Sequence, residues 1–230
     1  MTGHTNSKTT ILLVDSHPPT RTGISSFVSS FPDMEIVGEA DNGLDAQFLA
    51  SKLYPRLIMF DLNMPDLPPT SFAKWVREHF PQTALLVLTS HANKIPYLTV
   101  MMEAGAVGYL SKTISADELA ANIRRVASGE LVFDNQQMIA AYQWKKEVYE
   151  KIKCLTHQEI EVVKLLLKGK NNQAIADILN ISLKTVTYHL TSLFSKLQVH
   201  SRLEATLWAI EHLLDNLDFF PYPNRDKSLG

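Results

Sequence analysis

The sequence predicts two domains of different fold class: a doubly wound α/β domain with a five-stranded parallel sheet, then a small all-α domain. Short aliphatic and β-branched runs alternate with stretches of helical spacing over roughly the first 130 residues. Such alternation indicates a parallel sheet with helices on both faces. Beyond Asp134, apolar residues recur at helical spacing and no further strand-like run appears.

Five short apolar runs are the candidate strands of the first domain. In chain order they read TTILLVD, MEIVGEA, RLIMFD, TALLVLTS and AVGYLSK, and their composition is typical of buried parallel strands. Helical spacing occupies five stretches after them, at about 19–31, 43–53, 70–79, 94–104 and 115–128. This order predicts a helix after each strand.

Polar side chains stand where these strands end. Asp15 follows the first strand, Asp61 the third and Lys112 the fifth, while Thr89 and Ser90 end the fourth. In open parallel sheets the functional residues gather beyond the carboxyl ends of the strands. We therefore expect two carboxylates, two hydroxyls and an ammonium at one edge of the sheet. Strand ends are polar in any soluble protein, but suitable residue types on four strands together exceed that background.

Residues 9–130 resemble the receiver domain of bacterial two-component response regulators, which has a flavodoxin-like fold. The stretches ILLVDSHPPTRTGI, DLNMPD, LTSH and GYLSKTISADEL carry the resemblance and occur in the order found in that family. A receiver accepts a phosphoryl group on an aspartate, from a sensor histidine kinase or a small phosphodonor. The resemblance therefore implies these two partner classes for this chain.

The resemblance also implies a role for each strand-end residue. Asp61 is the expected phosphoacceptor, and Asp15, Asp61 and the Asn63 backbone carbonyl are the expected Mg²⁺ ligands. Thr89 and Lys112 are expected to contact the phosphoryl oxygens. The chemistry fits these residues, because a carboxylate can be a nucleophile and a magnesium ion with a lysine can neutralise the charge that spreads during phosphoryl transfer.

A phosphoryl group adds charge near −2, which could pull in Thr89 and move the adjacent surface. By the resemblance, Tyr109 matches the aromatic residue that rotates on activation. Thr89 and Tyr109 are therefore the expected switch.

Two features depart from the family pattern. Ser16 stands where a second acid, a direct Mg²⁺ ligand in the family, usually follows Asp15. We therefore expect weaker Mg²⁺ binding and slower phosphorylation. The stretch MPDLPPTSF lacks the glycines that usually follow the acceptor, and Asp66 with Pro68 and Pro69 predicts a stiffer, more acidic loop. A receiver that acts without phosphorylation therefore remains an alternative.

The rest of the chain divides into three segments. Residues 131–153 are polar and amphipathic and predict a helical linker, residues 154–214 predict four helices, and residues 215–230 form a tail. Thr156 with Glu159 predicts a capping box at the first of the four helices.

The second of these helices is expected to turn Ala174, Ile175, Ile178 and Leu179 inward. Ser182 is expected to cap the third helix.

The third of these helices, within TVTYHLTSLFSKL, has one apolar stripe and one polar stripe. Val186, Leu190, Leu193 and Leu197 recur at helical spacing and should face a core. Two helices joined by a short turn, the second with an outward polar stripe, are the plan of a helix-turn-helix. Periodicity alone would allow any small helical bundle.

Residues 155–205 resemble the LuxR/NarL-type DNA-binding domain along their whole length, in the stretch that begins LTHQEIEVVKLLLKGK. The resemblance places the polar stripe in the DNA major groove, which is wide enough for a helix. It also implies a homodimer formed by the fourth helix, with Leu207, Trp208 and Leu214 as candidate contacts. The candidate DNA-binding residues are Lys184, Thr185, Thr187, Tyr188, Thr191, Ser195, Lys196 and Arg202.

Composition limits the alternatives. The net charge is −2, with ten Lys and Arg against fourteen Asp and Glu in 1–134, and six against five in 155–214. This weakly basic second half counts mildly against tight DNA binding. The sequence has a single cysteine, Cys154, which excludes an intrachain disulfide. No apolar run approaches the roughly 20 residues of a membrane helix. The first ten residues lack the apolar stretch of a signal peptide. We expect a cytoplasmic protein without a membrane partner.

Two classes of function fit these observations. One is a DNA-binding transcription regulator switched by phosphorylation of Asp61. The other is an atypical receiver that acts without phosphate, through constitutive DNA binding or protein–protein docking. An enzyme has little support, because the sequence shows no catalytic triad or zinc-ligand spacing and its eight histidines are scattered.

Overall fold

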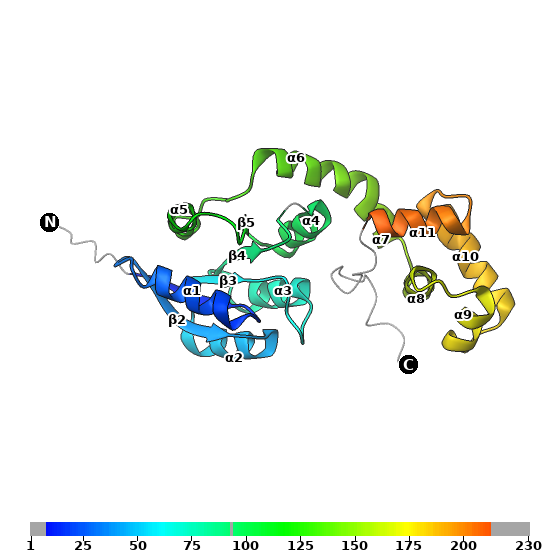
Figure 1. Cartoon of the computed structure of the whole chain (residues 1–230). Coiled ribbons are helices and arrows are strands. Elements are labelled where there is room, and N and C mark those ends of the chain that lie inside the picture. Colours follow the sequence, from blue (N-terminus) through cyan, green and yellow to red (C-terminus); the bar gives the residue numbers. More distant parts are fainter. Residues whose placement is uncertain (1–7, 93, 213–230) are drawn as a thin grey trace. The chain divides into compact units, whose positions relative to one another are not determined.

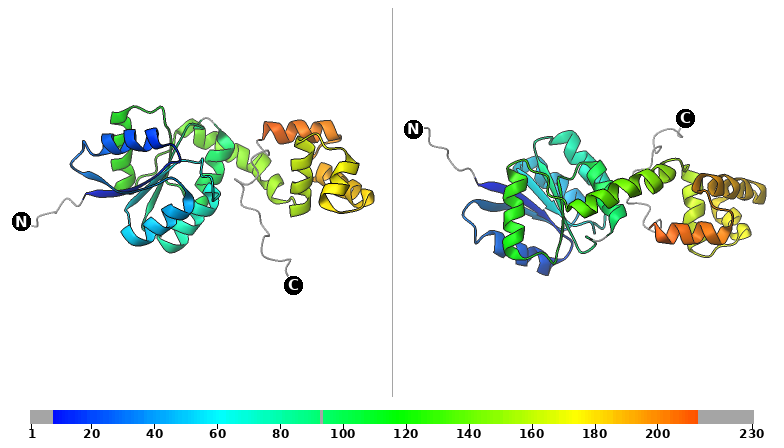
Figure 2. Two further views of the ribbon diagram at one scale, coloured as in Figure 1. Left: turned by 60° about the horizontal axis from the view of Figure 1, so that its bottom comes forward. Right: turned by 90° about the horizontal axis from the view of Figure 1, so that it is seen from above.

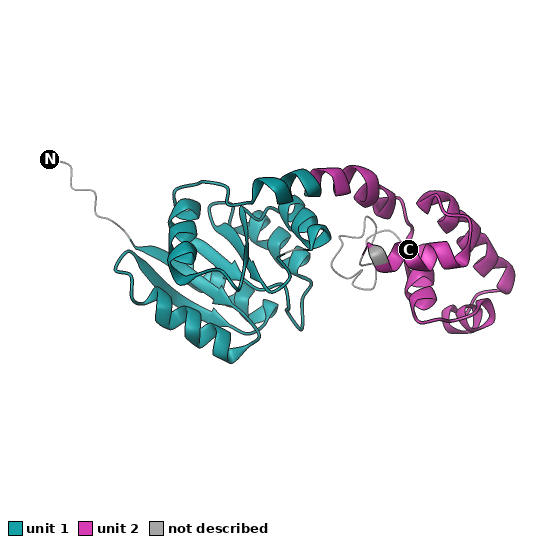
Figure 3. Ribbon diagram, turned by 45° about the horizontal axis from the view of Figure 1, so that its top comes forward, with its two compact units in different colours: residues 1–141 teal, residues 142–230 magenta. Residues whose placement is uncertain are grey.

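The structure, a computed structural model, describes residues 8–92 and 94–212 (Figure 1). The chain divides into two compact units, residues 1–141 and 142–230, shown in two colours in Figure 3. The first unit is α/β and the second is helical, which confirms the predicted fold classes. No helix within the described residues is long and apolar enough to cross a membrane.

The first unit is built on one parallel sheet with strand order β2-β1-β3-β4-β5. Every residue of β3 is buried, as are the last four of β1, because both strands lie inside the sheet with helices on either face. The strands are β1 (Thr9–Val14), β2 (Met34–Ala40), β3 (Leu57–Phe60), β4 (Ala84–Thr89) and β5 (Gly108–Ser111).

Five helices cover the two faces of this sheet. Figure 2 shows α1 and α5 together on one face and α2 and α3 on the other, and α4 packs beside α3. Leu119 and Ile123 of α5 and Val28 of α1 belong to one buried cluster with residues of β1, β3 and β4. The helices are α1 (Pro18–Val28), α2 (Gly43–Leu53), α3 (Pro69–His79), α4 (Ile95–Ala104) and α5 (Ala116–Ala127).

After α5 the chain stays attached to the first unit. Val132 is buried and bridges Gly108 in parallel, accepting a hydrogen bond from Tyr109 N–H at 3.1 Å. The following residues are helical from 135 to 153, as α6 (Asn135–Trp144), a π-helical turn η1 (Lys145–Tyr149) and α7 (Glu150–Lys153). The division between the units therefore falls within a helical stretch.

The second unit contains α8 (His157–Leu167), α9 (Asn172–Leu179), α10 (Leu183–Leu197) and α11 (Arg202–Glu211). The predicted capping box of α8 is confirmed, and Ser182 caps α10 by accepting from Thr185 N–H at 3.1 Å.

One predicted core residue of the second unit was wrong. Ile178 was expected to face inward but is 54% exposed, whereas Ala176 is buried beside Ile175. A helix of only eight residues leaves its inward face poorly defined by periodicity, which explains the error.

Candidate functional site

Two buried carboxylates lie side by side at the carboxyl edge of the sheet. Asp15 and Asp61 follow the adjacent strands β1 and β3, and their side chains are 2% and 6% exposed. Their backbones continue the sheet pairing, since Asp15 N–H donates to the Ala40 carbonyl and Asp61 N–H to the Val14 carbonyl. The regular parallel ladder thus fixes both positions.

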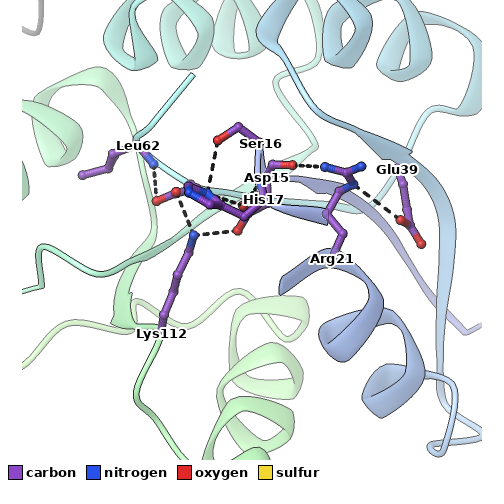
Figure 4. Close-up of polar contacts among 8 residues, drawn as sticks. Asp15, Ser16, His17, Arg21, Glu39, Leu62 and Lys112 are labelled. Atoms are coloured by element: carbon purple, nitrogen blue, oxygen red, sulfur yellow. Dashed lines mark hydrogen bonds and ion pairs between the residues drawn. The ribbon is translucent and has the colours of Figure 1, made fainter. Parts of the chain in front are cut away.

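Lys112 joins the two carboxylates. Its Nζ lies 2.6 Å from Asp15 Oδ2 and 2.7 Å from Asp61 Oδ2 (Figure 4). Buried carboxylates are costly unless they are paired and hydrogen-bonded, and one ammonium here serves two of them. The three side chains together keep a formal charge of −1, which favours a further cation.

A main-chain amide also binds the Asp61 carboxylate. Its Oδ1 accepts from Leu62 N–H at 2.8 Å, while Oδ2 accepts from Lys112. Charge-assisted bonds of this kind are short and strong. The carboxylate therefore has a fixed orientation at the end of β3.

Thr89 and Tyr109 are linked through the main chain of His91. Thr89 is fully buried and its Oγ1 accepts from His91 N–H at 3.2 Å, while the Tyr109 hydroxyl donates to the His91 carbonyl at 3.2 Å. Burial raises the pKa of Tyr109 above its ordinary value, and the neighbouring Tyr97 and Asp61 add to this. Tyr109 is therefore a neutral hydrogen-bond donor, and its bond would respond to any movement of the peptide after Thr89.

A histidine that the sequence reasoning did not single out lies beside the carboxylates. His17 N–H donates to Asp15 Oδ1 at 2.8 Å, and its ring Nδ1 lies 3.5 Å from the same oxygen. Asp15, His17 and Asp61 each offer one ligand atom, and these atoms lie within 4.8 Å of one another. The position of His17, two residues after Asp15, was the available signal.

Two carboxylates and a backbone carbonyl are ligands that suit Mg²⁺. Asp15 and Asp61 fit this description by their proximity, and Asn63 is exposed two residues beyond Asp61. Ser16 adds no charge, and its Oγ lies 3.3 Å from His17 Nδ1. The donor set therefore fits a divalent cation, with imidazole rather than a third carboxylate nearby.

A second cation steadies the turn after β1. The Arg21 guanidinium donates to the main-chain carbonyl of Asp15 and lies 3.8 Å from Glu39 Oε2 (Figure 4). Because Arg21 binds the main-chain carbonyl of Asp15, the Asp15 carboxylate stays available for Lys112.

The second unit presents the predicted polar stripe on α10. The Thr187 hydroxyl donates to the Leu183 carbonyl and the Thr191 hydroxyl to the Thr187 carbonyl, both at 3.0 Å. Their donors are thus used within the helix, which leaves methyl groups and acceptor oxygens outward. Five of the predicted DNA-binding residues are exposed here: Lys184, Thr187, Tyr188, Thr191 and Ser195.

The other three predicted DNA-binding residues make contacts within the unit. Lys196 Nζ lies 2.9 and 2.7 Å from the two carboxylate oxygens of Glu159. Arg202 donates to Asn172 Oδ1 at 3.0 Å and to the Lys170 carbonyl, and the Thr185 hydroxyl is hydrogen-bonded to the Ser182 hydroxyl at 2.8 Å. All three remain half-exposed while bracing the helices.

Glu159 organises this part of the unit. It is 2% exposed, closes the capping box at Thr156 and accepts from Ser192 Oγ at 2.6 Å. Burial alone would raise the pKa of Glu159, but the hydrogen bonds from Lys196, Ser192 and Thr156 together hold it below its ordinary value. The carboxylate is therefore ionised near neutral pH and joins α8 to α10.

The predicted dimer contacts lie on α11. Leu207 is 56% exposed, and Leu203 and Ile210 flank it on the same exposed stripe. Trp208 is half-buried and stacks on His212 with ring centroids 4.4 Å apart. Leu214 lies outside the described residues.

The chain matches two family profiles, one for each unit. The family described as "Response regulator receiver domain" matches residues 11–124, and "Bacterial regulatory proteins, luxR family" matches residues 153–209. Response regulator protein VraR of Staphylococcus aureus is 36% identical over 205 residues, which cover 89% of this chain and 97% of VraR.

Solved structures show the same architecture. The response regulator ChrA of a heme-sensing two-component system is 27% identical with a TM-score of 0.52, covering 90% of this chain and 99% of ChrA. RcsB of Salmonella typhimurium is 22% identical with a TM-score of 0.60, covering 88% of this chain and all of the RcsB chain, and shows the fold alone. The chain therefore belongs to the response regulators that combine a receiver domain with a LuxR-type DNA-binding domain, a family of transcription regulators and not of enzymes.

Proposed function

We propose that this protein is a transcription regulator of a two-component system, in which phosphorylation of Asp61 switches DNA binding by the second unit. The observation that carries the proposal is the contact of Lys112 with both Asp15 and Asp61 at the sheet edge. The similarity to VraR, named a response regulator, supports the same function. A sensor histidine kinase or a small phosphodonor would supply the phosphoryl group to this cytoplasmic protein.

The residues of the pocket support in-line transfer. An oxygen of Asp61 forms a bond to phosphorus as the bond to the donor nitrogen or oxygen breaks, which leaves an acyl phosphate on the protein. Lys112 is already within hydrogen-bond distance of that carboxylate, so it can remain with the phosphoryl oxygens and neutralise their charge. Leu62 N–H keeps the carboxylate oriented.

The hydrogen bonds of His91 provide a route from the pocket to the surface. We infer that Thr89 turns toward the phosphoryl group and gives up the bond from His91 N–H. The His91 carbonyl holds the buried Tyr109 hydroxyl, so a shift of this peptide changes the support of Tyr109. The shared contacts with the His91 main chain support a coupled movement of Thr89 and Tyr109.

Receiver domains bind Mg²⁺ at an acidic pocket of this kind. A bound Mg²⁺ supplies charge neutralisation during transfer, and Asp15, Asp61 and the Asn63 carbonyl are the residues that would hold it. We propose that binding is weak, because Ser16 contributes no charge and Lys112 already occupies one oxygen of each carboxylate. Phosphorylation is then slow relative to receivers with two consecutive acids.

We propose that the exposed stripe of α10 lies in the major groove of DNA. Thr187 and Thr191 offer methyl groups that suit thymine, and hydroxyl oxygens that accept from a base. Lys184 is the one lysine on this stripe, so a single unit should bind with modest affinity. Dimerisation through α11, with Leu207 and Trp208 as contacts, would offset that weakness.

A second function is favoured by the same pocket. Lys112 already neutralises one of the two carboxylates, and Ser16 replaces an acid, so the receiver can hold a stable arrangement without metal or phosphate. In this case DNA binding is constitutive, or the receiver docks another protein.

A gel-shift series on genomic fragments, with and without beryllofluoride as phosphate mimic, separates these functions. Binding that tightens with the mimic in the wild type and not in Asp61→Ala supports the switch. Glu78→Gln, a change of an exposed acid near the end of α3, is the matched control and should respond as the wild type does. Equal binding with and without the mimic supports constitutive DNA binding. No binding at any salt concentration supports a receiver that acts by docking another protein.

A further inference from the structure

After α5, residues 131–141 contact the main chain beside both predicted switch residues. Tyr109 N–H donates to the Val132 carbonyl at 3.1 Å. Farther along, Gln137 Nε2 donates to the Ala92 carbonyl at 3.1 Å, in the turn that follows β4. All of these residues belong to the first unit. The start of the linker is therefore bound to the part of the receiver that is expected to move.

The contact of Gln137 falls one residue beyond His91, whose N–H donates to Thr89 Oγ1 at 3.2 Å. Ala92 is buried, and a buried carbonyl needs a hydrogen-bond donor, which Gln137 supplies. A movement of the turn that frees the Thr89 hydroxyl would also shift the Ala92 carbonyl. Such a movement would strain or break the bond from Gln137.

The start of α6 holds the Gln137 side chain in place. Asp134 Oδ1 accepts from the N–H groups of Gln136 and Gln137, at 2.9 and 3.0 Å, and so caps this helix. One turn later Ala141 is buried, and its carbonyl lies 3.5 Å from the hydroxyl of the buried Thr99 on α4. Because the helix is fixed on both sides of Gln137, the amide group is directed at the turn without further ordering of the backbone.

We propose that Gln137 is a positioning residue for phosphoryl transfer to Asp61. By holding the Ala92 carbonyl, it keeps the turn after β4 in the arrangement in which His91 N–H occupies the Thr89 hydroxyl. The inference rests on the proposed function, because it assigns a restraint on the same switch. Loss of the contact should make the phosphorylated arrangement easier to reach. By reciprocity, a phosphoryl group on Asp61 should loosen the start of α6.

The direction of the effect separates this restraint from a purely structural contact. One neutral hydrogen bond changes an equilibrium by roughly two- to tenfold. If Gln137 only packed α6 onto the receiver, its loss would loosen the helix and leave the affinity for a phosphate mimic unchanged or lower. If Gln137 restrains the turn, its loss loosens the helix and raises that affinity.

The test compares three full-length proteins: the wild type, Gln137→Met and Gln136→Met. Methionine keeps the length and the apolar stem of glutamine but has no N–H donor. Gln136 is an exposed neighbour on the same helix, so its variant is the matched control. Fluorine NMR measures the affinity for beryllofluoride at one fixed Mg²⁺ concentration. Amide hydrogen exchange of His91 and of α6 is followed with and without the mimic.

We expect Gln137→Met to bind beryllofluoride about threefold more tightly or better, and its His91 amide to exchange faster by a similar factor. Gln136→Met should match the wild type in both measurements. The mimic should speed exchange in α6 of the wild type and have little further effect in Gln137→Met.

Unchanged or weaker binding of the mimic by Gln137→Met overturns the inference and leaves the proposed function intact. An equal change in Gln136→Met also overturns it, because the effect would then not come from the contact with Ala92. Absence of mimic binding in all three proteins would instead overturn the proposed function, and this restraint with it.

Discussion

Glu159 shows how one carboxylate can hold a small domain together. Its two oxygens bind Lys196 and Ser192 from α10 and the start of α8, and the side chain is only 2% exposed. Removing one partner of a buried ion pair leaves the other without compensation. Lys196, a candidate DNA-binding residue by resemblance, therefore also has a structural role.

Glu159→Ala should destabilise the second unit by about 2–3 kcal/mol, because it removes the charge pair and half of the α8 cap. Hydrogen exchange of the α8 and α10 amides measures this loss without interference from the first unit. Glu161→Ala is the matched control, since Glu161 makes a half-exposed pair with Lys164 at 3.0 Å and should cost well under 1 kcal/mol. Equal losses for the two variants would contradict the assignment.

Acid should weaken the second unit through the same carboxylate. The pKa of Glu159 is lower in the folded chain than its ordinary value of about 4.3, so its stabilisation is present above that pH and is lost as the pH falls through the folded pKa. Hydrogen exchange of α8 and α10 amides at several pH values between 5 and 3, with rates corrected for the intrinsic effect of pH, should show this loss. Glu159→Gln should flatten that dependence, and an unchanged slope in this variant would show that another group is responsible.

At the scale of the element, α2 is tied to the loop that carries the phosphoacceptor. The Asp66 carboxylate accepts from Gly43 N–H and Leu44 N–H, at 2.7 and 2.8 Å, and Asn42 Oδ1 accepts from the next free amide, Asp45 N–H, at 2.8 Å. Gly43 permits this approach, since a Cβ there would lie 2.8 Å from Leu67 Cβ.

Asp66→Ala should therefore destabilise α2 by about 1 kcal/mol. Two amides of its first turn lose their acceptor, and the positive end of the helix dipole loses the nearby carboxylate. Faster hydrogen exchange in α2, measured relative to α5, is the observable. Asp66→Asn keeps an acceptor and should show a smaller effect. If α2 exchanges at the wild-type rate in Asp66→Ala, the capping role is wrong.

The exposed side chains of α10 should differ in their effect on the salt dependence of DNA binding. We expect Lys184 to contact one DNA phosphate, so Lys184→Ala should reduce the slope of log affinity against log salt concentration by about 0.9. Thr187→Val should leave the slope unchanged, since the hydroxyl donates to the Leu183 carbonyl and carries no charge. Fluorescence anisotropy with one DNA duplex at several salt concentrations measures both, and equal slopes for all three proteins would contradict the placement of Lys184.

The sequence predicted the elements of this fold well because their signals are local. Strand composition and capping residues such as Thr156 and Ser182 depend on neighbours a few positions away, and these were confirmed. Two features that depend on distant contacts were missed. The approach of His17 to Asp61 needs the pairing of β1 with β3, so the place of His17 two residues after Asp15 does not by itself predict it, and no local pattern predicts the bridge between Val132 and Gly108.

The same limit applies to the candidate site. The meeting of Asp15, Asp61 and Lys112 could be predicted because parallel strands bring their carboxyl ends to one edge. The partner of Lys196 could not, because Glu159 is 37 residues away and its own motif already assigned it to a cap. The contact of Asp66 with α2 could not be predicted either. Its carboxylate, expected to make the loop after Asp61 acidic, accepts hydrogen bonds from two amides of α2.

At the scale of the whole molecule, assembly is the remaining determinant of DNA binding. Leu203, Leu207 and Ile210 recur at helical spacing on α11 and are 68%, 56% and 56% exposed. An apolar stripe of this kind on a short helix is a suitable contact for a second copy, and two linked DNA-binding units on a repeated half-site gain affinity without new base contacts.

Leu207→Glu should abolish that dimer. In a symmetric contact the same surface of both copies meets, so the new carboxylate would be buried against the apolar stripe of the second copy or against the second copy's own Glu. Sedimentation of the wild type with beryllofluoride should show a dimer that the variant lacks. Binding to a DNA with two half-sites should weaken at least tenfold, while binding to a single half-site should change less than twofold. Leu44→Glu, a change of an equally exposed leucine on α2, controls for the added charge. Loss of binding to both DNAs would instead mean that Leu207 supports the fold of the second unit, and an intact dimer would place the contact elsewhere.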